Sequence, residues 1–182
     1  MTKALIVIDI QESFRQRESW ARVSTPDIVD RAGRLVDIAR GNGDLVVWVL
    51  HTEPGTGNPF DPDSGFVRLM DGLKPEAGDP VLAKTSRNSF TTTNLQQILT
   101  EKGIRELVLC GIQTEQCCET TARVAADLGF DVTFVTEATA TFPIPHRNGV
   151  DELGVDAVIE RTEYALSGRF ATISTIAELA VG

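Results

Sequence analysis

Residues 3–9 read KALIVID, five consecutive apolar residues between Lys3 and Asp9. An uninterrupted run that is rich in β-branched residues is typical of a strand covered on both faces. Similar runs occur at 45–50 (LVVWVL), 106–110 (ELVLC) and 132–135 (VTFV). Because strands buried on both faces are characteristic of parallel sheets, these runs predict the centre of an α/β domain.

Helical patterns separate the predicted strands. Residues 27–40 place apolar side chains at helical spacing after Pro26, and Gly41 follows the pattern where a helix would end. Two further helices are predicted at 94–103, with Asn94 as N-cap, and at 114–129, with Thr114 as N-cap; weaker predictions are a strand at 157–159 and a helix at 171–180. The alternation predicts one α/β domain over residues 1–182, with a mostly parallel sheet and right-handed crossovers.

Composition narrows the classes of partner. The 182 residues include 26 acidic and 17 basic side chains, a formal net charge of −9, and 42% of them are hydrophobic. A uniformly acidic surface repels nucleic acids and anionic membranes, so we expect neither as a partner. The longest apolar run, 45–50, is too short to cross a bilayer, and Asp9 interrupts the N-terminal run before it could serve as a signal segment. We therefore expect a cytoplasmic protein.

Polar residues that end the apolar runs are the first candidates for function, because open parallel sheets bind ligands beyond the carboxyl ends of their strands. Asp9 ends the first run, and Lys84 ends a short run at 81–83. Cys117 lies in the first turn of the helix predicted from Thr114. A thiol at a helix N-terminus is expected to have a lowered pKa and to act as a nucleophile.

The other two cysteines are assigned to packing. Cys118 is turned about 100° around the helix from Cys117, and Cys110 lies in a predicted buried strand. With three cysteines, two of them adjacent, a disulfide framework is not expected. A redox role for the adjacent pair ranks low because neighbouring cysteines in a helix form a disulfide only with strain.

A cysteine nucleophile needs a proton acceptor, and the only histidines are His51 and His146. Asp9 could take this role if burial and a nearby cation hold it beside the thiol, and Lys84 is the leading candidate for that cation. Taken singly, each of the three residues also fits a structural role: a small buried thiol for Cys117, and solvated charges at strand ends for Asp9 and Lys84.

Taken together, three blocks of sequence resemble the isochorismatase-like cysteine hydrolases, a family that includes nicotinamidases, N-carbamoylsarcosine amidohydrolase, and ureidoacrylate and biuret hydrolases. The blocks are LIVIDIQ at 5–11 with Phe14, Lys84 with Asn88 and Phe90, and GIQTEQC at 111–117 followed by TAR at 121–123 and Ala125. They occur in the family's order and span most of the chain, and the block that ends at Cys117 is the most specific.

The resemblance implies a three-layer αβα sandwich with a six-stranded parallel sheet and a catalytic triad of Asp9, Lys84 and Cys117. It implies that Cys117 attacks a carbonyl or carbamoyl carbon to form a thioester, while Asp9 moves protons and Lys84 stabilises the charges. It also implies a cis peptide between Ile112 and Gln113, and an oxyanion held by the backbone N–H groups of Gln113 and Cys117.

Departures from the family's pattern bear on the substrate. Nicotinamidases carry a metal site of one Asp and two His in the loop after the second strand, whereas here that loop, 51–55, reads HTEPG. No metal or other cofactor is therefore expected. The position two after Lys84, often Arg in the family, is Ser86, with Arg87 beside it. Some isochorismatases that cleave vinyl ethers lack the cysteine, so Cys117 favours cleavage of a C–N bond.

Residues that contact the substrate are predicted from the segments that approach this edge of the sheet. Aromatic side chains suit a small flat amide, although Phe14 and Phe90 fit the core equally well and His51 could serve as a structural cap. The candidates are Gln11, Phe14, His51, Phe60 and Phe90. The turn-rich segment 51–80, with five prolines and five glycines, is expected to be a functional loop or a cover over the site.

These observations predict a metal-independent cysteine hydrolase that acts on a small amide, carbamoyl or ureido compound and assembles as a homo-oligomer. A vinyl-ether hydrolase of the same family and a non-catalytic scaffold of the same fold remain alternatives. Dinucleotide binding is excluded because DIQE at 9–12 follows the first strand, without the glycines that a pyrophosphate requires.

Overall fold

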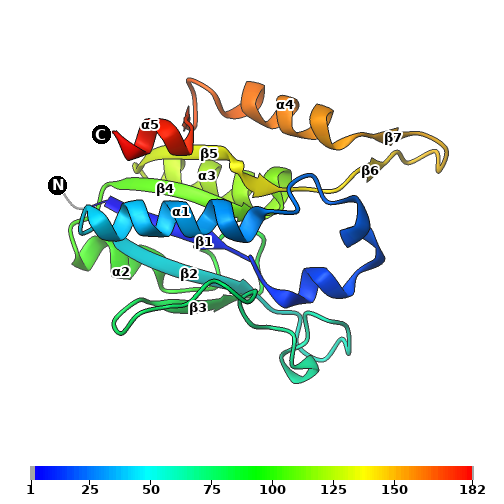
Figure 1. The fold of residues 1–182 in the computed structure, drawn as a ribbon, viewed down its shortest axis with the longest axis horizontal. Helices are drawn as coiled ribbons and strands as arrows, with labels where there is room; N and C mark the ends of the chain where they lie inside the picture. Colours follow the sequence, from blue (N-terminus) through cyan, green and yellow to red (C-terminus); the bar gives the residue numbers. More distant parts are fainter. Residues whose placement is uncertain (1–2, 182) are drawn as a thin grey trace.

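A six-stranded parallel sheet in the order β3-β2-β1-β4-β5-β8 forms the centre of the computed structural model, which describes residues 3–181 (Figure 1). The strands are β1 (Lys3–Ile8), β2 (Leu45–His51), β3 (Val81–Lys84), β4 (Glu106–Ile112), β5 (Asp131–Ala140) and β8 (Thr172–Ile173). The predicted three-layer α/β sandwich is confirmed.

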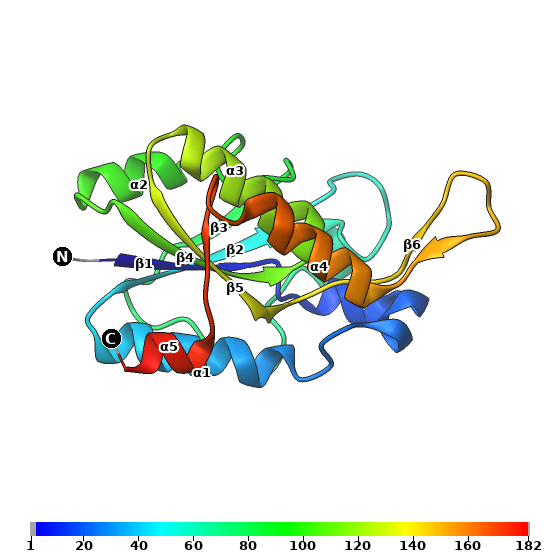
Figure 2. The same cartoon turned by 90° about the horizontal axis from the view of Figure 1, so that it is seen from above.

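Helices cover both faces of the sheet (Figure 2). One face carries α1 (Ile28–Gly41) and α5 (Ile176–Ala180), and the other carries α2 (Leu95–Glu101), α3 (Glu119–Asp127) and α4 (Val155–Leu166). Shorter helical turns are η1 (Glu12–Gln16), η2 (Glu18–Arg22), η3 (Pro62–Ser64) and the π-helical turn η4 (Thr114–Cys118). Strands β6 (Ile144–Pro145) and β7 (Glu152–Leu153) form a ribbon that projects from the body of the molecule.

Burial on both faces explains the continuous apolar runs. In β1, Leu5 and Val7 pack into the core beneath α1, while Ile6 and Ile8 pack into the core beneath α2 and α3. All four side chains are at most 2% exposed. The period-2 alternation of side chains thus supplies both cores from one strand.

Two sequence predictions near the C-terminus are wrong. Residues 157–159 lie inside α4 rather than in a strand, because Val158, Thr162 and Leu166 recur every four residues and together form the buried stripe of a helix. The helix predicted at 171–180 begins only at Ile176: residues 172–173 form the edge strand β8, and a capping box between Thr175 and Glu178 starts α5.

The helix that carries Cys117 also begins differently from the prediction. Gln113, not Thr114, is the N-cap, and Thr114 is the first residue of η4. The hydroxyl of Thr114 pairs with that of Thr139, 2.7 Å away on β5, instead of capping the helix. Asn94 is the N-cap of α2, as predicted.

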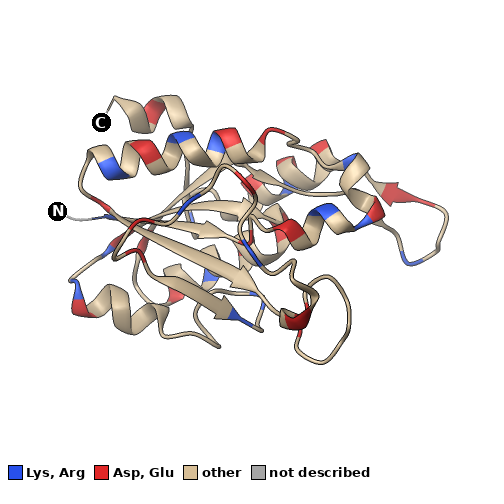
Figure 3. Ribbon diagram, turned by 60° about the horizontal axis from the view of Figure 1, so that its bottom comes forward, with Lys and Arg blue, Asp and Glu red and all other residues tan. Residues whose placement is uncertain are grey.

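Charged residues lie mostly on helices and loops, whereas the strand interiors are almost free of them (Figure 3). In residues 3–181 no helix is both long and apolar enough to span a bilayer.

The loop between β2 and β3 packs against the segment after β1. Gln11 bridges to Leu69, and the backbone N–H of Glu12 donates to the Arg68 carbonyl at 2.9 Å. This loop therefore lies beside the carboxyl edge of the sheet.

Candidate active site

Four neighbouring strands, β3, β2, β1 and β4, each place a side chain at the same edge of the sheet. Lys84 and His51 are paired as the last residues of β3 and β2. Asp9 directly follows β1, and Cys117 lies in the turn η4 that follows β4. The sheet thus brings together residues that are far apart in the sequence.

Asp9 is fully buried and has a positive φ of 54°. Asp tolerates this left-handed conformation better than most residues. Its Oδ2 accepts a hydrogen bond from Lys84 Nζ at 2.8 Å. Its Oδ1 has no hydrogen-bond partner among residues 3–181, so one buried oxygen of this carboxyl group is left to interact with a proton or a ligand.

Lys84 is also fully buried, and its ammonium group is the centre of the site. Besides Asp9, Nζ donates to Cys117 Sγ at 3.3 Å and to the Ser86 carbonyl at 3.2 Å. It also lies 3.4 Å from His51 Nδ1. An ammonium group has only three N–H donors, so it shares them among four neighbours and links the candidate base directly to the candidate nucleophile.

The pKa of Cys117 differs from the sequence prediction. Burial raises the pKa of this thiol to about 12, and the Asp9 carboxylate adds to the rise more than Lys84 offsets it. Burial likewise raises the pKa of Asp9, although Lys84 opposes the change. The expected low pKa at a helix N-terminus is therefore wrong here: the thiol keeps its proton at neutral pH and needs a base to become a nucleophile.

The turn that carries Cys117 begins at a close approach between two strands. Gly111 has a φ of 143°, and a Cβ there would lie 2.0 Å from the Ile8 carbonyl oxygen. The peptide bond between Ile112 and Gln113 is cis, as the family resemblance implies. The Gln113 carbonyl accepts from the N–H groups of Gln116 and Cys118. The Gln113 N–H donates to no residue that the structure describes, so it is free to bind an oxyanion.

A small cavity of about 290 Å³, including its open mouth, reaches Asp9 and Cys117. Three predicted substrate contacts, Phe14, His51 and Phe60, line it together with Gln113. The Phe14 and Phe60 rings pack edge to face, with their centroids 4.9 Å apart. The cavity is therefore narrow and partly aromatic, which suits a small substrate.

Two predicted contacts do not line this cavity. The amide group of Gln11 holds the main chain of His51, accepting from its N–H at 2.7 Å and donating to its carbonyl at 3.0 Å. Phe90 packs against Phe130 in the core, with ring centroids 5.9 Å apart. Gln11 thus positions His51. Phe90 lies in the core, the alternative location that the sequence also allowed.

Four further residues that were not predicted as substrate contacts also line the cavity: Arg17, Glu53, Arg87 and Gln116. They lie on loops and short turns whose course a sequence pattern does not fix. Arg17 follows Phe14 by one helical turn of η1, and Arg87 follows Lys84 by three residues. Proximity to predicted site residues was the signal that could have found them.

The other two cysteines have the predicted packing positions. Cys110 and Cys118 are fully buried in the two cores, and all three cysteines are free thiols. His146 lies on the projecting ribbon, outside the cavity.

The donor set at the site does not fit a metal ion. Within residues 3–181 no three or more His, Cys, Asp or Glu side chains are grouped so that they could hold one. Asp9 Oδ2 already forms an ion pair with the ammonium group of Lys84. Two guanidinium groups, those of Arg17 and Arg87, also line the cavity, and these cations would repel a metal.

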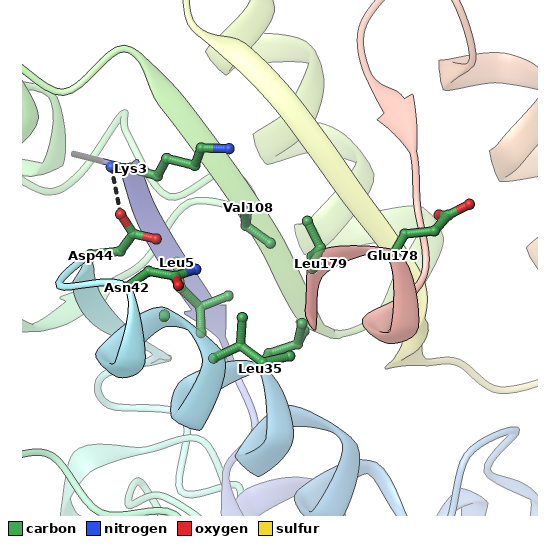
Figure 4. A pocket seen from close by; sticks show the side chains of 10 residues that line it. Lys3, Leu5, Leu35, Asn42, Asp44, Val108, Glu178 and Leu179 are labelled. Carbon is green, nitrogen blue, oxygen red and sulfur yellow. Dashed lines mark hydrogen bonds between the residues drawn. The ribbon is translucent and has the colours of Figure 1, made fainter. Parts of the chain in front are cut away.

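A second cavity lies at the opposite edge of the sheet, between α1 and α5 (Figure 4). Leu35, Val108 and Leu179 line its floor, and Asp44 at its rim accepts a hydrogen bond from the Lys3 backbone N–H at 2.9 Å. No cysteine or histidine lines it, and neither do Asp9 and Lys84. The candidate catalytic residues are therefore grouped at the carboxyl edge alone, and this second cavity contains none of them.

The amino-acid sequence matches one protein family along nearly its whole length. Residues 3–178 match the isochorismatase domain model. The chain is 30% identical over 178 residues to the isochorismatase family protein YrdC of Bacillus subtilis, covering 97% of this chain and 94% of that one. It is 34% identical over 167 residues to a streptothricin hydrolase of Streptomyces noursei, covering 90% of this chain and 65% of the relative. It is 35% identical over 152 residues to nicotinamidase 3 of Arabidopsis thaliana, covering 76% of this chain and 73% of that one.

Solved structures share the whole fold. An isochorismatase from Pseudomonas putida superposes with a TM-score of 0.87 at 29% identity, covering 97% of this chain and 89% of that one. A cysteine hydrolase from Pseudomonas syringae superposes with a TM-score of 0.89 at 24% identity, covering 98% of this chain and 91% of that one.

Proposed function

This chain belongs to the isochorismatase family of hydrolases, and we propose that it is a metal-independent cysteine hydrolase that cleaves the C–N bond of a small amide, carbamoyl or ureido compound. One observation carries the proposal: buried Lys84 Nζ contacts both Asp9 Oδ2, at 2.8 Å, and Cys117 Sγ, at 3.3 Å. A base, a cation and a thiol thus lie together at one end of a cavity. Relatives named nicotinamidase and streptothricin hydrolase support a hydrolytic reaction.

The first step requires a proton transfer because the thiol is protonated at neutral pH. Asp9 takes the thiol proton on Oδ1, the oxygen without a partner in the described residues. The Cys117 sulfur attacks the carbonyl carbon at the same time, so a C–S bond forms and the carbonyl π electrons move to oxygen. The free N–H of Gln113 donates to this oxyanion, and Lys84 stabilises the negative charge on sulfur and on Asp9 while the proton moves.

The second half of the reaction returns each group to its starting state. The oxyanion re-forms the carbonyl, the C–N bond breaks, and Asp9 gives its proton to the departing nitrogen. A thioester on Cys117 and free ammonia or an amine result. Asp9 then removes a proton from water, which attacks the thioester, and the proton passes to the departing sulfur. The net reaction consumes one water and regenerates the Cys117 thiol.

Trapping the thioester tests this proposal. Small primary amides, carbamoyl compounds and ureas are screened for ammonia or amine release, and acid-quenched reactions with active compounds are analysed by fragment-resolved mass spectrometry. We expect an acyl adduct on Cys117, no adduct on Cys118, and loss of both turnover and adduct in Cys117→Ala. The matched control is Cys118→Ala, which removes the adjacent buried thiol and should keep the adduct. Release of amine that persists in Cys117→Ala, or a screen without any turnover, would refute the proposal.

A further inference from the structure

Lys84 and Cys117 contact each other although their strands are not neighbours in the sheet. Strand β3 ends at Lys84 and β4 leads to the turn of Cys117, and both β2 and β1 lie between them. The sheet therefore sets the 3.3 Å distance between Lys84 Nζ and Cys117 Sγ only through two intervening strands. A direct connection between the segment after β3 and the helix after β4 fixes this contact more closely.

The hydroxyl group of Thr121 makes such a connection. It is fully buried in α3, and its oxygen Oγ1 lies 2.6 Å from the Cys117 carbonyl oxygen, which can only accept. Oγ1 also accepts from the backbone N–H of Ser89 at 3.1 Å and lies 3.2 Å from Ser89 Oγ. Because the Thr121 proton is used on the carbonyl, the Ser89 hydroxyl must be the donor in the last contact. The single donor and both lone pairs of the Thr121 hydroxyl are thus occupied.

The connection to Ser89 distinguishes Thr121 from an ordinary helical threonine. A bond from a threonine hydroxyl to the carbonyl four residues earlier occurs in many helices and by itself indicates no function. Thr100 in α2 makes the same bond, to the Gln96 carbonyl at 2.8 Å, and binds no other segment. Within the described residues 3–181, no hydrogen bonds other than those of Thr121 join residues 85–93 to residues 114–127.

The loop that contains Ser89, residues 85–92, is closed by a side chain of its own. Thr92 Oγ1 accepts from the first two N–H groups of the loop, at 3.0 and 3.1 Å. In the same loop the Ser86 carbonyl accepts from Lys84 Nζ at 3.2 Å. One short loop thus binds the ammonium group through a carbonyl and the helix after the nucleophile through Ser89, so it couples the positions of the two.

Resting on the proposed hydrolase function, we propose that Thr121 is a positioning residue of the reaction, which keeps Cys117 Sγ within reach of Lys84 Nζ by tying α3 to the loop after β3. Thr121 acts through these two residues, because it does not itself line the cavity. A misplacement of reacting groups by about 1 Å can cost about 10²-fold in rate. Loss of the hydroxyl should therefore lower kcat and leave KM nearly unchanged.

Alkylation of Cys117 tests this inference without requiring a substrate. The Cys117 sulfur attacks the methylene carbon of iodoacetamide, iodide leaves and the thiol proton passes to Asp9; peptide mass spectrometry gives the rate for each cysteine. We expect Thr121→Val, which replaces only the hydroxyl by a methyl group, to slow alkylation of Cys117 by about tenfold. Thr121→Ser keeps the hydroxyl and should retain most of the native rate. The matched control Thr100→Val removes the same bond from α2 and should leave the rate unchanged.

Two further measurements separate positioning from loss of the fold. Cys110 is fully buried in the core, so its alkylation reports opening of the whole domain and should stay equally slow in every variant. Ser89→Ala removes one contact to the loop and keeps the bond from Thr121 to the Cys117 carbonyl, so it tests the connection even if Thr121→Val does not fold. We expect Ser89→Ala to slow alkylation of Cys117 by about threefold, the value of one hydrogen bond.

The outcomes decide the positioning role. An unchanged Cys117 rate in folded Thr121→Val, or in Ser89→Ala where Thr121→Val does not fold, refutes it, and so does an equal loss in Thr100→Val. A faster rate also refutes it, because the connection would then only shield the thiol.

Turnover separates this inference from the proposed reaction. A lower kcat at constant KM in Thr121→Val, restored in Thr121→Ser, supports both. If the alkylation rates follow the prediction but no amide, carbamoyl or ureido compound is hydrolysed, the positioning role is supported and the proposed reaction fails. If such a compound is hydrolysed and Thr121→Val has native kcat, the reaction stands and the positioning role is refuted.

Discussion

Lys84 Nζ donates a 2.8 Å hydrogen bond to Asp9 Oδ2, and neither side chain is exposed to solvent. Removing one partner of a buried ion pair leaves an uncompensated charge, so we expect Lys84→Met to lower the free energy of unfolding by about 3–5 kcal/mol. Urea denaturation at pH 7 measures this change. The double variant Asp9→Asn/Lys84→Met removes both charges and should lose less than the sum of the two single variants. Additive losses would show that the two charges do not interact.

Asp9→Asn tests the role of the carboxylate as a base. Asn adopts positive φ as readily as Asp, so the backbone at φ 54° should be kept. We expect kcat/KM toward an active amide to fall by about 10²–10⁴-fold, the usual contribution of a general base. Steady-state assays of ammonia release measure the loss, and circular dichroism checks the fold. An Asp9→Asn enzyme with native kcat/KM would remove Asp9 from the mechanism.

Alkaline pH should destabilise the protein through its buried thiols. Burial raises the pKa of Cys110 from its ordinary value of 9.0 to about 12. The folded state therefore binds more protons than the unfolded state between these values, so this stabilising contribution is complete below pH 9 and is lost as the pH rises toward 12. The expected slope is about −1.4 kcal/mol per pH unit for each such thiol.

Cys110→Ala isolates this effect from other groups that titrate in the same range. Denaturant unfolding of both proteins from pH 8 to pH 11 gives the difference in free energy at each pH. Truncation of a buried side chain adds a constant loss, whereas removal of the thiol should make the variant's decline above pH 9 shallower. Parallel pH profiles for the two proteins would contradict the prediction.

Gly111→Ala should prevent the close approach of β1 and β4 beside the site. An added Cβ would lie 2.0 Å from the Ile8 carbonyl oxygen, and the positive φ of Gly111 adds backbone strain. We expect a loss of more than about 4 kcal/mol, or failure to fold. Gly33→Ala in α1 is the matched control, because its Cβ meets nothing within 4 Å. That substitution should stabilise the protein by up to about 1 kcal/mol, and thermal melts of both variants test the contrast.

Much of the sheet was predictable because its strands are buried on both faces. The run from Ala4 to Ile8 is apolar throughout for that reason, and the first four strand predictions correspond to β1, β2, β4 and β5. The edge strand β8 has only two residues. So short a segment leaves no periodic pattern, and the sequence prediction therefore merged it into the following helix and sought a strand inside α4 instead.

The grouping of Asp9, Lys84 and Cys117 followed from the ends of apolar runs and from the family resemblance, whereas the environment of the thiol did not. A helix N-terminus alone favours a thiolate, but burial and the neighbouring Asp9 carboxylate raise the pKa of Cys117. Arg17 and Arg87 were not predicted to line the cavity because loops and short turns, not periodic elements, carry them there. Burial and loop paths are long-range properties, and a local pattern contains little information about either.

Lys84, His51, Asp9 and Cys117 come from four adjacent strands or the turns after them, so no local segment of the chain can form the candidate site by itself. The site is complete only when β3, β2, β1 and β4 have all paired, contacts that span from residue 9 to residue 117. Such non-local pairing forms slowly compared with helices. A chain in which β4 has not yet paired with β1 therefore lacks the contact between Lys84 Nζ and Cys117 Sγ, and the grouping of carboxylate, ammonium and thiol exists only in the paired sheet.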